Sequence, residues 1–268
     1  MHNNITDRDD IEIIECEQGT AEWFAARAGV CSASMFGVVL AKVGLLDEKQ
    51  QMYVDAIRAG NDEKAAMLIA GYKAPPKSTT VAKALRGEKI GEWSDAALNY
   101  AFRLACERVA GEPLVEQFET YAMRRGKELE EACRIRHEID INEVVDLAGF
   151  IRTKDGRFGA SADALVGKSG GGEYKCFYAP DKTRPIILEN DFGDIKPQVQ
   201  GCIWLYGAEW WDSCLYFPAL KSVGKEYTRQ RSLRDDAFID NMETELLAFD
   251  ALVCEYEVQI RAPRIIIT

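Results

Sequence analysis

One glycine-rich segment, Gly167–Gly172, places the strongest constraint on what this chain can fold into. Runs typical of β-strands lie on both sides of it, at 158–166 and 173–178. A glycine-rich turn between two such runs indicates a β-hairpin. The hairpin would bring Asp163 of the first strand beside Glu173, which starts the second. The sequence therefore predicts that two carboxylates from adjacent strands converge on one point.

The second predicted strand begins Glu173-Tyr174-Lys175. Because side chains alternate along a strand, Glu173 and Lys175 should share one face and Tyr174 should point to the other. Two carboxylates and the Tyr174 backbone carbonyl are hard oxygen ligands suited to Mg²⁺, and the Lys175 ammonium would lie beside a reacting phosphate. This spacing is typical of a metal-dependent nuclease centre. In a chain that is 29% charged, the alternative is that all three are solvated strand residues.

Further candidates lie on predicted helices. Glu130 follows Gly126 by one helical turn, and the missing side chain there would allow close approach of a backbone or a DNA strand, so Glu130 is a candidate third carboxylate. Gln198 and Gln200 point to different sides of a helix, so at most one should face the metal centre. A phosphate-binding P-loop is excluded, because Ala162 occupies the place of its first glycine.

Composition limits the class of protein. With 268 residues and 47% hydrophobic content, we expect one domain over 1–268, with 1–10 flexible and 73–93 a mobile loop. No apolar run approaches the roughly 20 residues that cross a bilayer, and the N-terminus is polar, so we expect a cytosolic protein without membrane contact. Eight cysteines without a C-x-x-C pair indicate buried free thiols. The histidines, His2 and His137, are too few for histidine-based zinc sites or dyads.

The net charge of −11 is unfavourable for DNA binding, because affinity for duplex DNA comes from cationic groups that replace counterions. A basic face or channel would resolve the conflict. Helical patterns dominate to about residue 138, and strand patterns follow at 144–151, 158–166, 173–178, 214–217 and 227–230 before a closing helix over 233–258. The predicted fold is α/β, with a mixed central sheet flanked by helices.

Six sequence blocks in this order resemble the YqaJ-like phage recombination nucleases, typified by lambda exonuclease. They are Q-G-x-x-x-W-x-x-x-R-x-G from Gln18 with A-S at Ala33-Ser34, G-K-x-x-E at Gly126–Glu130, S-x-D at Ser161–Asp163, E-x-K-C at Glu173–Cys176, and Q-V-Q at Gln198–Gln200. Each block is weak alone, but six in order over most of the chain are specific.

The resemblance implies a restriction-endonuclease-like core and a Mg²⁺-dependent enzyme, with one or two ions and Mn²⁺ as a substitute. Such an enzyme degrades the 5′-ended strand of linear double-stranded DNA and leaves 3′ overhangs for recombination. It also implies a homotrimer ring around the DNA, a single-strand annealing protein as partner, and work in the cytoplasm of a bacterium or a phage-infected host.

The resemblance assigns roles residue by residue. For the catalytic and metal site it implies Asp163 and Glu173 as metal ligands, Lys175 as the group acting on water, and Glu130 and Gln200 as supporting residues. For DNA it implies Arg27 as the receptor of the 5′-phosphate, Ser34 and Ser161 beside it, Gln198 as a DNA contact, and Met123 as an apolar wedge between base pairs. Helical core packing is the alternative for Met123.

Two other functions compete with the nuclease as explanations of the sequence. A DNA-end-binding or recombination-scaffold protein would keep the fold without the chemistry, and the intact set of Asp163, Glu173 and Lys175 argues against it. An iron–sulfur nuclease would need a cysteine cluster near the C-terminus, where Cys254 stands alone.

Overall fold

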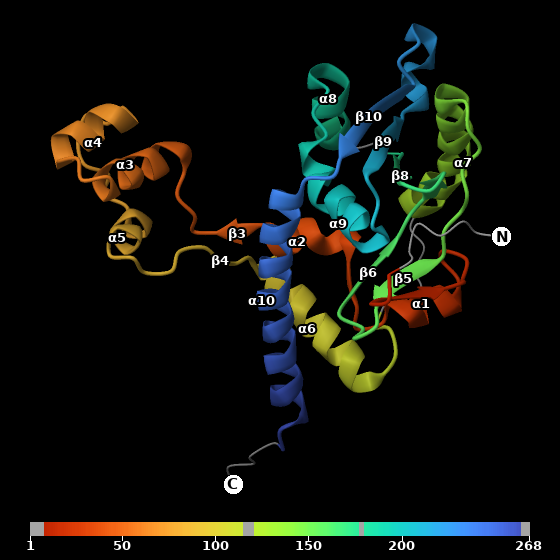
Figure 1. The fold of residues 1–268 in the computed structure, drawn as a ribbon, viewed down its shortest axis with the longest axis horizontal. Coiled ribbons are helices and arrows are strands. Elements are labelled where there is room, and N and C mark those ends of the chain that lie inside the picture. Colours follow the sequence, from red (N-terminus) through yellow and green to blue (C-terminus); the bar gives the residue numbers. More distant parts are fainter. Residues whose placement is uncertain (1–7, 115–120, 177–179, 264–268) are drawn as a thin grey trace. The chain divides into compact units, whose positions relative to one another are not determined.

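The computed structural model describes residues 8–114, 121–176 and 180–263. Contacts divide the chain into two compact units, of which the first comprises residues 1–40 and 99–268 and the second residues 41–98 (Figure 1). The first unit contains both large sheets and all candidate site residues. The second is a small insertion in the first.

The first unit contains two mixed four-stranded sheets (Figure 1). One has the order β1-β5-β6-β2, in which only the β6–β2 pair is parallel: β1 (Ile11–Ile14), β5 (Phe150–Thr153), β6 (Phe158–Ser161) and β2 (Cys31–Ser32). The other has the order β10-β9-β8-β7, in which only the β9–β8 pair is parallel: β10 (Tyr227–Leu233), β9 (Trp210–Tyr216), β8 (Gly170–Lys175) and β7 (Ala164–Val166). The predicted mixed α/β class is confirmed.

The predicted strand 158–166 is in fact two strands that belong to different sheets. The chain leaves β6 after Ser161 and enters β7 at Ala164. At Ala162 the backbone N–H donates to the Tyr206 hydroxyl at 3.1 Å, and the carbonyl accepts from Gln18 Nε2 at 2.9 Å. Since the N–H and the carbonyl of Ala162 are both bound to side chains, neither can pair with a neighbouring strand.

Helices cover the sheets, as predicted. They are α1 (Ala21–Arg27), η1 (Ala33–Met35), α2 (Phe36–Leu40), α6 (Asp95–Ala110), α7 (Tyr121–Ile141), α8 (Pro180–Glu189), η2 (Gly193–Ile195), α9 (Lys196–Tyr206), η3 (Pro218–Val223) and α10 (Asp236–Arg261). Helix α9 contacts strands of both sheets and is buried from Val199 to Tyr206. Helix α7 packs on β8, β9 and β10. The two helices lie on opposite faces of that sheet, since Lys175 bonds to α9 and the neighbouring Tyr174 bonds to α7.

The second unit packs three helices around its own apolar core, with a two-stranded ladder at its base: α3 (Glu48–Arg58), α4 (Glu63–Ala70), α5 (Thr79–Leu85), β3 (Lys42–Val43) and β4 (Glu92–Trp93). Helix α5 and strand β4 lie within 73–93, so the expectation of an irregular loop over that range is wrong. Ser78 accepts a hydrogen bond from the Val81 N–H, and burial of Val81 and Ala84 holds the helix on the core.

Two further predictions are settled here. The expected strand 144–151 is shorter and later, because only Phe150 and Ile151 of that range belong to β5. All eight cysteines are free, and Cys31, Cys133, Cys202 and Cys214 are buried, which confirms the predicted free thiols. In the described parts of the chain, no helix combines the length and apolar character that would let it span a bilayer.

Candidate active site

The predicted carboxylate pair lies at the start of the β7–β8 hairpin. Ala164 pairs with Gly172, so the preceding Asp163 is next to Glu173 across the ladder. Asp163 accepts a hydrogen bond from the Tyr174 N–H at 2.6 Å. The Lys175 ammonium donates to Glu173 Oε1 at 2.7 Å, which confirms that these two side chains share a face. Residues brought together by a hairpin thus form one acidic centre with a cation at its side.

Burial makes this centre electrostatically strained. Desolvation raises the pKa of Asp163 well above its usual value, and the charge of Glu173 raises it further against the opposing effects of Lys175 and the Tyr174 N–H. For Lys175, desolvation lowers the pKa, but the negative charges of Glu173 and Asp163 outweigh it and leave the pKa raised. Lys175 is therefore an ammonium group, which can donate hydrogen bonds and bind phosphate but cannot accept a proton.

The donor set fits a divalent cation. Among the described residues, two buried polar side-chain atoms have no hydrogen-bond partner, and one of them is Glu173 Oε2. A buried carboxylate oxygen without a partner is costly unless a cation or water binds it. The described chain contains no cluster of three or more His, Cys, Asp or Glu side chains arranged for one metal ion. The candidate metal ligands are therefore two carboxylates, Asp163 and Glu173.

Glu130 and the Tyr174 carbonyl are the other predicted metal ligands. Glu130, on α7, is close enough for its charge to raise the pKa of Asp163. Its role as a third carboxylate ligand stays a prediction. The role of the Tyr174 carbonyl stays a prediction.

Of the two glutamines, Gln198 and not Gln200 contacts the acidic centre. Gln198 Oε1 accepts from Lys175 Nζ at 3.0 Å and so belongs to the acidic centre. Gln200 is buried, donates to the Leu233 carbonyl at 2.8 Å and accepts from the Asp235 N–H at 3.0 Å. Because both ends of its amide are bound to backbone, Gln200 holds the junction of β10 and α10 instead of supporting the site.

A second feature of the same unit is a pocket of about 180 Å³ lined by Arg27 and Arg103, which we name the anion pocket. The Arg27 guanidinium lies in it, donates to Ser32 Oγ at 3.1 Å and stacks 4.1 Å from the centre of the Trp23 ring. Ser34, which also lines the pocket, lies 3.1 Å from Ser32, oxygen to oxygen. Arg27 and Ser34 are thus brought together as predicted. Glu173 is close enough for its charge to act on the pKa of Arg27, so the pocket is near the acidic centre.

Ser161 and Met123 are placed differently from these. Ser161 accepts a hydrogen bond from Trp23 Nε1 at 2.8 Å. It therefore reaches the pocket only through Trp23, which lines it. Met123 falls in α7, but its side chain lies outside the described residues, so the choice between wedge and core packing stays open.

Sequence reasoning missed the contribution of α6 to the pocket. Arg103 and Tyr100 line it, and the Arg103 guanidinium lies 4.9 Å from the centre of the Tyr100 ring. Glu107, a buried carboxylate that also lines the pocket, lies 3.9 Å from Arg103. No signal in the sequence separates Arg103 from other helix-surface arginines, because it is more than 70 residues distant from Arg27.

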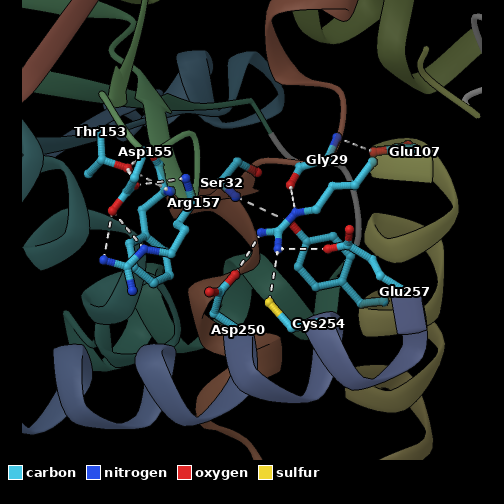
Figure 2. A network of polar contacts seen from close by, with 12 residues as sticks. Gly29, Ser32, Glu107, Thr153, Asp155, Arg157, Asp250, Cys254 and Glu257 are labelled. Atoms are coloured by element: carbon cyan, nitrogen blue, oxygen red, sulfur yellow. Dashed lines mark hydrogen bonds and ion pairs between the residues drawn. The ribbon is translucent and has the colours of Figure 1, made fainter. Parts of the chain in front are cut away.

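A network of polar contacts fixes the loop that carries this pocket (Figure 2). The Gly29 N–H donates to Glu107 at 2.9 Å, and its carbonyl accepts from Arg108 Nε at 2.8 Å. The Arg108 guanidinium in turn contacts Asp250 at 2.7 Å and Glu257 at 3.3 Å on α10. Two adjacent residues of α6 therefore bind both the N–H and the carbonyl of Gly29, which lies between Arg27 and Ser32 in the sequence.

Sequence reasoning also missed a buried polar network on the face of β8 opposite Glu173 and Lys175. His137 is fully buried on α7, with Nδ1 at 3.0 Å from the Tyr174 hydroxyl and Nε2 at 3.1 Å from Asp212. Burial alone would raise the pKa of Asp212, but hydrogen bonds from Arg231 and His137 hold it at about 2. The ionised Asp212 therefore anchors the face of β8 opposite Glu173 and Lys175.

Replacing Gly29 by alanine should lower the free energy of unfolding by about 1–3 kcal/mol. Gly29 has φ of +72°, and an added Cβ would lie 2.5 Å from Arg108 Cγ. Gly111→Ala is the control, because Gly111 has φ of +74° but nothing within 4 Å of an added Cβ. Urea unfolding should show the larger loss for Gly29→Ala. Equal losses would show that backbone conformation, and not the Arg108 contact, determines the cost.

Asp163→Asn should stabilise the metal-free protein at pH 8. Because the pKa of Asp163 is raised in the folded state, ionisation of this group removes stability as the pH rises from the unfolded-state pKa through the folded-state pKa. Because asparagine cannot ionise, the variant should have a higher melting temperature than the unchanged protein in EDTA at pH 8. Near pH 4 the two melting temperatures should agree. Asp146→Asn, at an exposed position, is the control. A lower melting temperature for Asp163→Asn at pH 8 would contradict the assigned strain.

No protein-family model matches the chain, and no curated protein matches it. Among solved structures, the alkaline exonuclease LHK-Exo from Laribacter hongkongensis is similar, with a TM-score of 0.62 and 29% identity, covering 90% of this chain and 97% of that one. The same exonuclease in complex with dAMP gives the same values. Both structures are of an exonuclease, which confirms the resemblance to YqaJ-like phage recombination nucleases inferred from the six sequence blocks.

Proposed function

We propose that this protein is a Mg²⁺-dependent exonuclease that degrades the 5′-ended strand of linear double-stranded DNA and leaves 3′ overhangs for recombination by annealing. One observation carries the proposal: Asp163 and Glu173 meet beside the Lys175 ammonium, and Glu173 Oε2 is buried without a partner. The exonuclease neighbours support a nuclease of the phage type.

Each group would have a separate task in phosphodiester hydrolysis. Mg²⁺ held by Asp163 and Glu173 would supply positive charge to the phosphate and make water more acidic. Lys175, fixed by Glu173 and Gln198, would orient the attacking water or a phosphate oxygen through its N–H groups. The Tyr174–His137–Asp212 network would keep β8 rigid while substrate binds.

The pocket would receive the 5′ end of the strand. Its two guanidinium groups, from Arg27 and Arg103, and the hydroxyls of Ser32 and Ser34 are suited to a phosphate with several free oxygens. A terminal phosphate monoester carries about −1.5 to −2 charges at neutral pH, against −1 for an internal diester. Desolvation, together with repulsion from Arg103, lowers the pKa of Arg27, and a bound phosphate would relieve both effects.

The remaining parts of the proposal rest on the sequence resemblance. They are a restriction-endonuclease-like core, a homotrimer ring that confines cationic groups to a DNA channel, a single-strand annealing protein as partner, and work in the cytoplasm.

Lys175→Ala and Asp163→Ala should each reduce digestion of linear, 5′-phosphorylated duplex with Mg²⁺ by at least about 1,000-fold, because each removes a group that contacts the reacting phosphate or its cation. Release of nucleotides measures the rate, and EDTA should abolish it. Lys168→Ala, in the exposed hairpin turn, is the control for loss of a nearby lysine. DNA binding without hydrolysis by the unchanged protein would instead support the silent scaffold. Full activity of either site variant would contradict the assignment.

Arg103→Gln should weaken discrimination between DNA ends. We expect kcat/KM on 5′-phosphorylated duplex to fall about 10-fold, as for the loss of one charge-assisted contact of about 1.4 kcal/mol. The value on 5′-hydroxyl duplex should change much less. Arg184→Gln is the control, because Arg184 lies on α8 paired with Glu189. An equal loss on both substrates would show that Arg103 does not read the terminal phosphate.

A further inference from the structure

The segment 73–89 has a charge opposite to that of the whole chain. The protein carries a net charge of −11, yet this segment has one acidic residue, Glu88, against the cations Lys73, Lys77, Lys83, Arg86 and Lys89. It lies within 73–93, one of two stretches that the sequence resemblance does not cover; the other is the tail after Tyr227. An acidic protein that acts on DNA needs such a concentration of cations somewhere on its surface.

The second unit presents these cations to solvent on a fixed scaffold. Val81 and Ala84 bury one side of α5 in the core of the unit, and Arg58 donates to the Ala84 carbonyl at 2.8 Å. All five cationic side chains of 73–89 are exposed. The segment is therefore an ordered surface on a helix and its two flanks.

The cations of this segment are largely not neutralised. Arg86 contacts Glu88, and Lys83 lies 3.8 Å from Glu92. For Lys73, Lys77 and Lys89, the structure records no acidic partner within the parts of the chain that it describes.

The arginines of strand β10 show the opposite arrangement. Arg229 and Arg231 both contact the buried Asp212, and Arg229 also contacts Asp140. The charges of these two arginines are largely neutralised by carboxylates, whereas those of Lys73, Lys77 and Lys89 are not. Unpaired exposed lysines release condensed counterions when they meet a polyanion.

We propose that the surface 73–89 of the second unit binds the phosphodiester backbone of duplex DNA. The proposal rests on the proposed function and adds to it a second contact with DNA, made by residues other than the catalytic ones. The chain enters this unit shortly after Ser34 and leaves it just before Tyr100, and both residues line the anion pocket. Both ends of the second unit are thus joined through the chain to the elements that would receive the end of the strand. Its contacts are sequence-independent and should hold the duplex between cleavage events.

The test compares two double variants that remove equal charge from the same unit. Lys77→Gln with Lys89→Gln changes the proposed surface. Lys49→Gln with Lys64→Gln changes exposed lysines of α3 and α4, which lie outside the proposed surface. The affinity for a short labelled duplex is measured in EDTA by fluorescence anisotropy over a range of salt concentrations. Melting temperatures of both variants should equal that of the unchanged protein, because all four side chains are exposed.

The slope of log affinity against log salt should fall by about 2 for Lys77→Gln with Lys89→Gln, since each phosphate contact contributes about 0.9. Between about 50 and 200 mM salt, the unchanged protein should then lose about 10-fold more affinity than this variant. The control should keep the original slope. If the unchanged protein binds DNA and all three slopes agree, this proposal is overturned and the proposed function stands. If the unchanged protein does not bind duplex at all, both are overturned.

Discussion

The two hydrogen bonds that occupy the backbone of Ala162 determine where the acidic centre forms. The Tyr206 hydroxyl accepts from its N–H, and Gln18 donates to its carbonyl, so neither group can join a strand ladder. The chain therefore passes from one sheet to the other at this residue, and the next residue, Asp163, meets Glu173 across the new ladder. A strand that continued unbroken from 158 to 166 would keep its residues within one sheet.

Strand β8 then divides two kinds of polar chemistry between its faces. Glu173 and Lys175 face α9, where a buried carboxylate oxygen has no partner, while Tyr174 between them faces His137 and the fully paired Asp212. The satisfied network makes one face rigid. The other face keeps a buried carboxylate oxygen without a partner, on which the proposed cation site rests. The strained carboxylate and the rigid network thus belong to adjacent residues of β8. A rigid neighbourhood of this kind can hold an energetically unfavourable group in place at a functional site.

The sequence predicts what depends on local rules. Alternation on β8 relates Glu173 to Lys175, and the glycine-rich turn joins their strand to Asp163. It does not predict contacts made by tertiary packing. The choice between Gln198 and Gln200 depends on where β10 ends, and the burial of His137 depends on a sheet that packs on a helix with many charges. Arg103 reaches Arg27 only through the fold.

The anion pocket is built from two stretches of chain that the insertion at residues 41–98 separates. To assemble the pocket, the chain must close a loop of that length, and the entropy of loop closure grows only with the logarithm of length, by about 0.6 kcal/mol for each doubling. The insertion can therefore be lengthened, shortened or exchanged at small thermodynamic cost to the pocket, provided that its ends stay close together. Such a position would let the inserted unit change while the residues of the pocket and of the acidic centre stay the same.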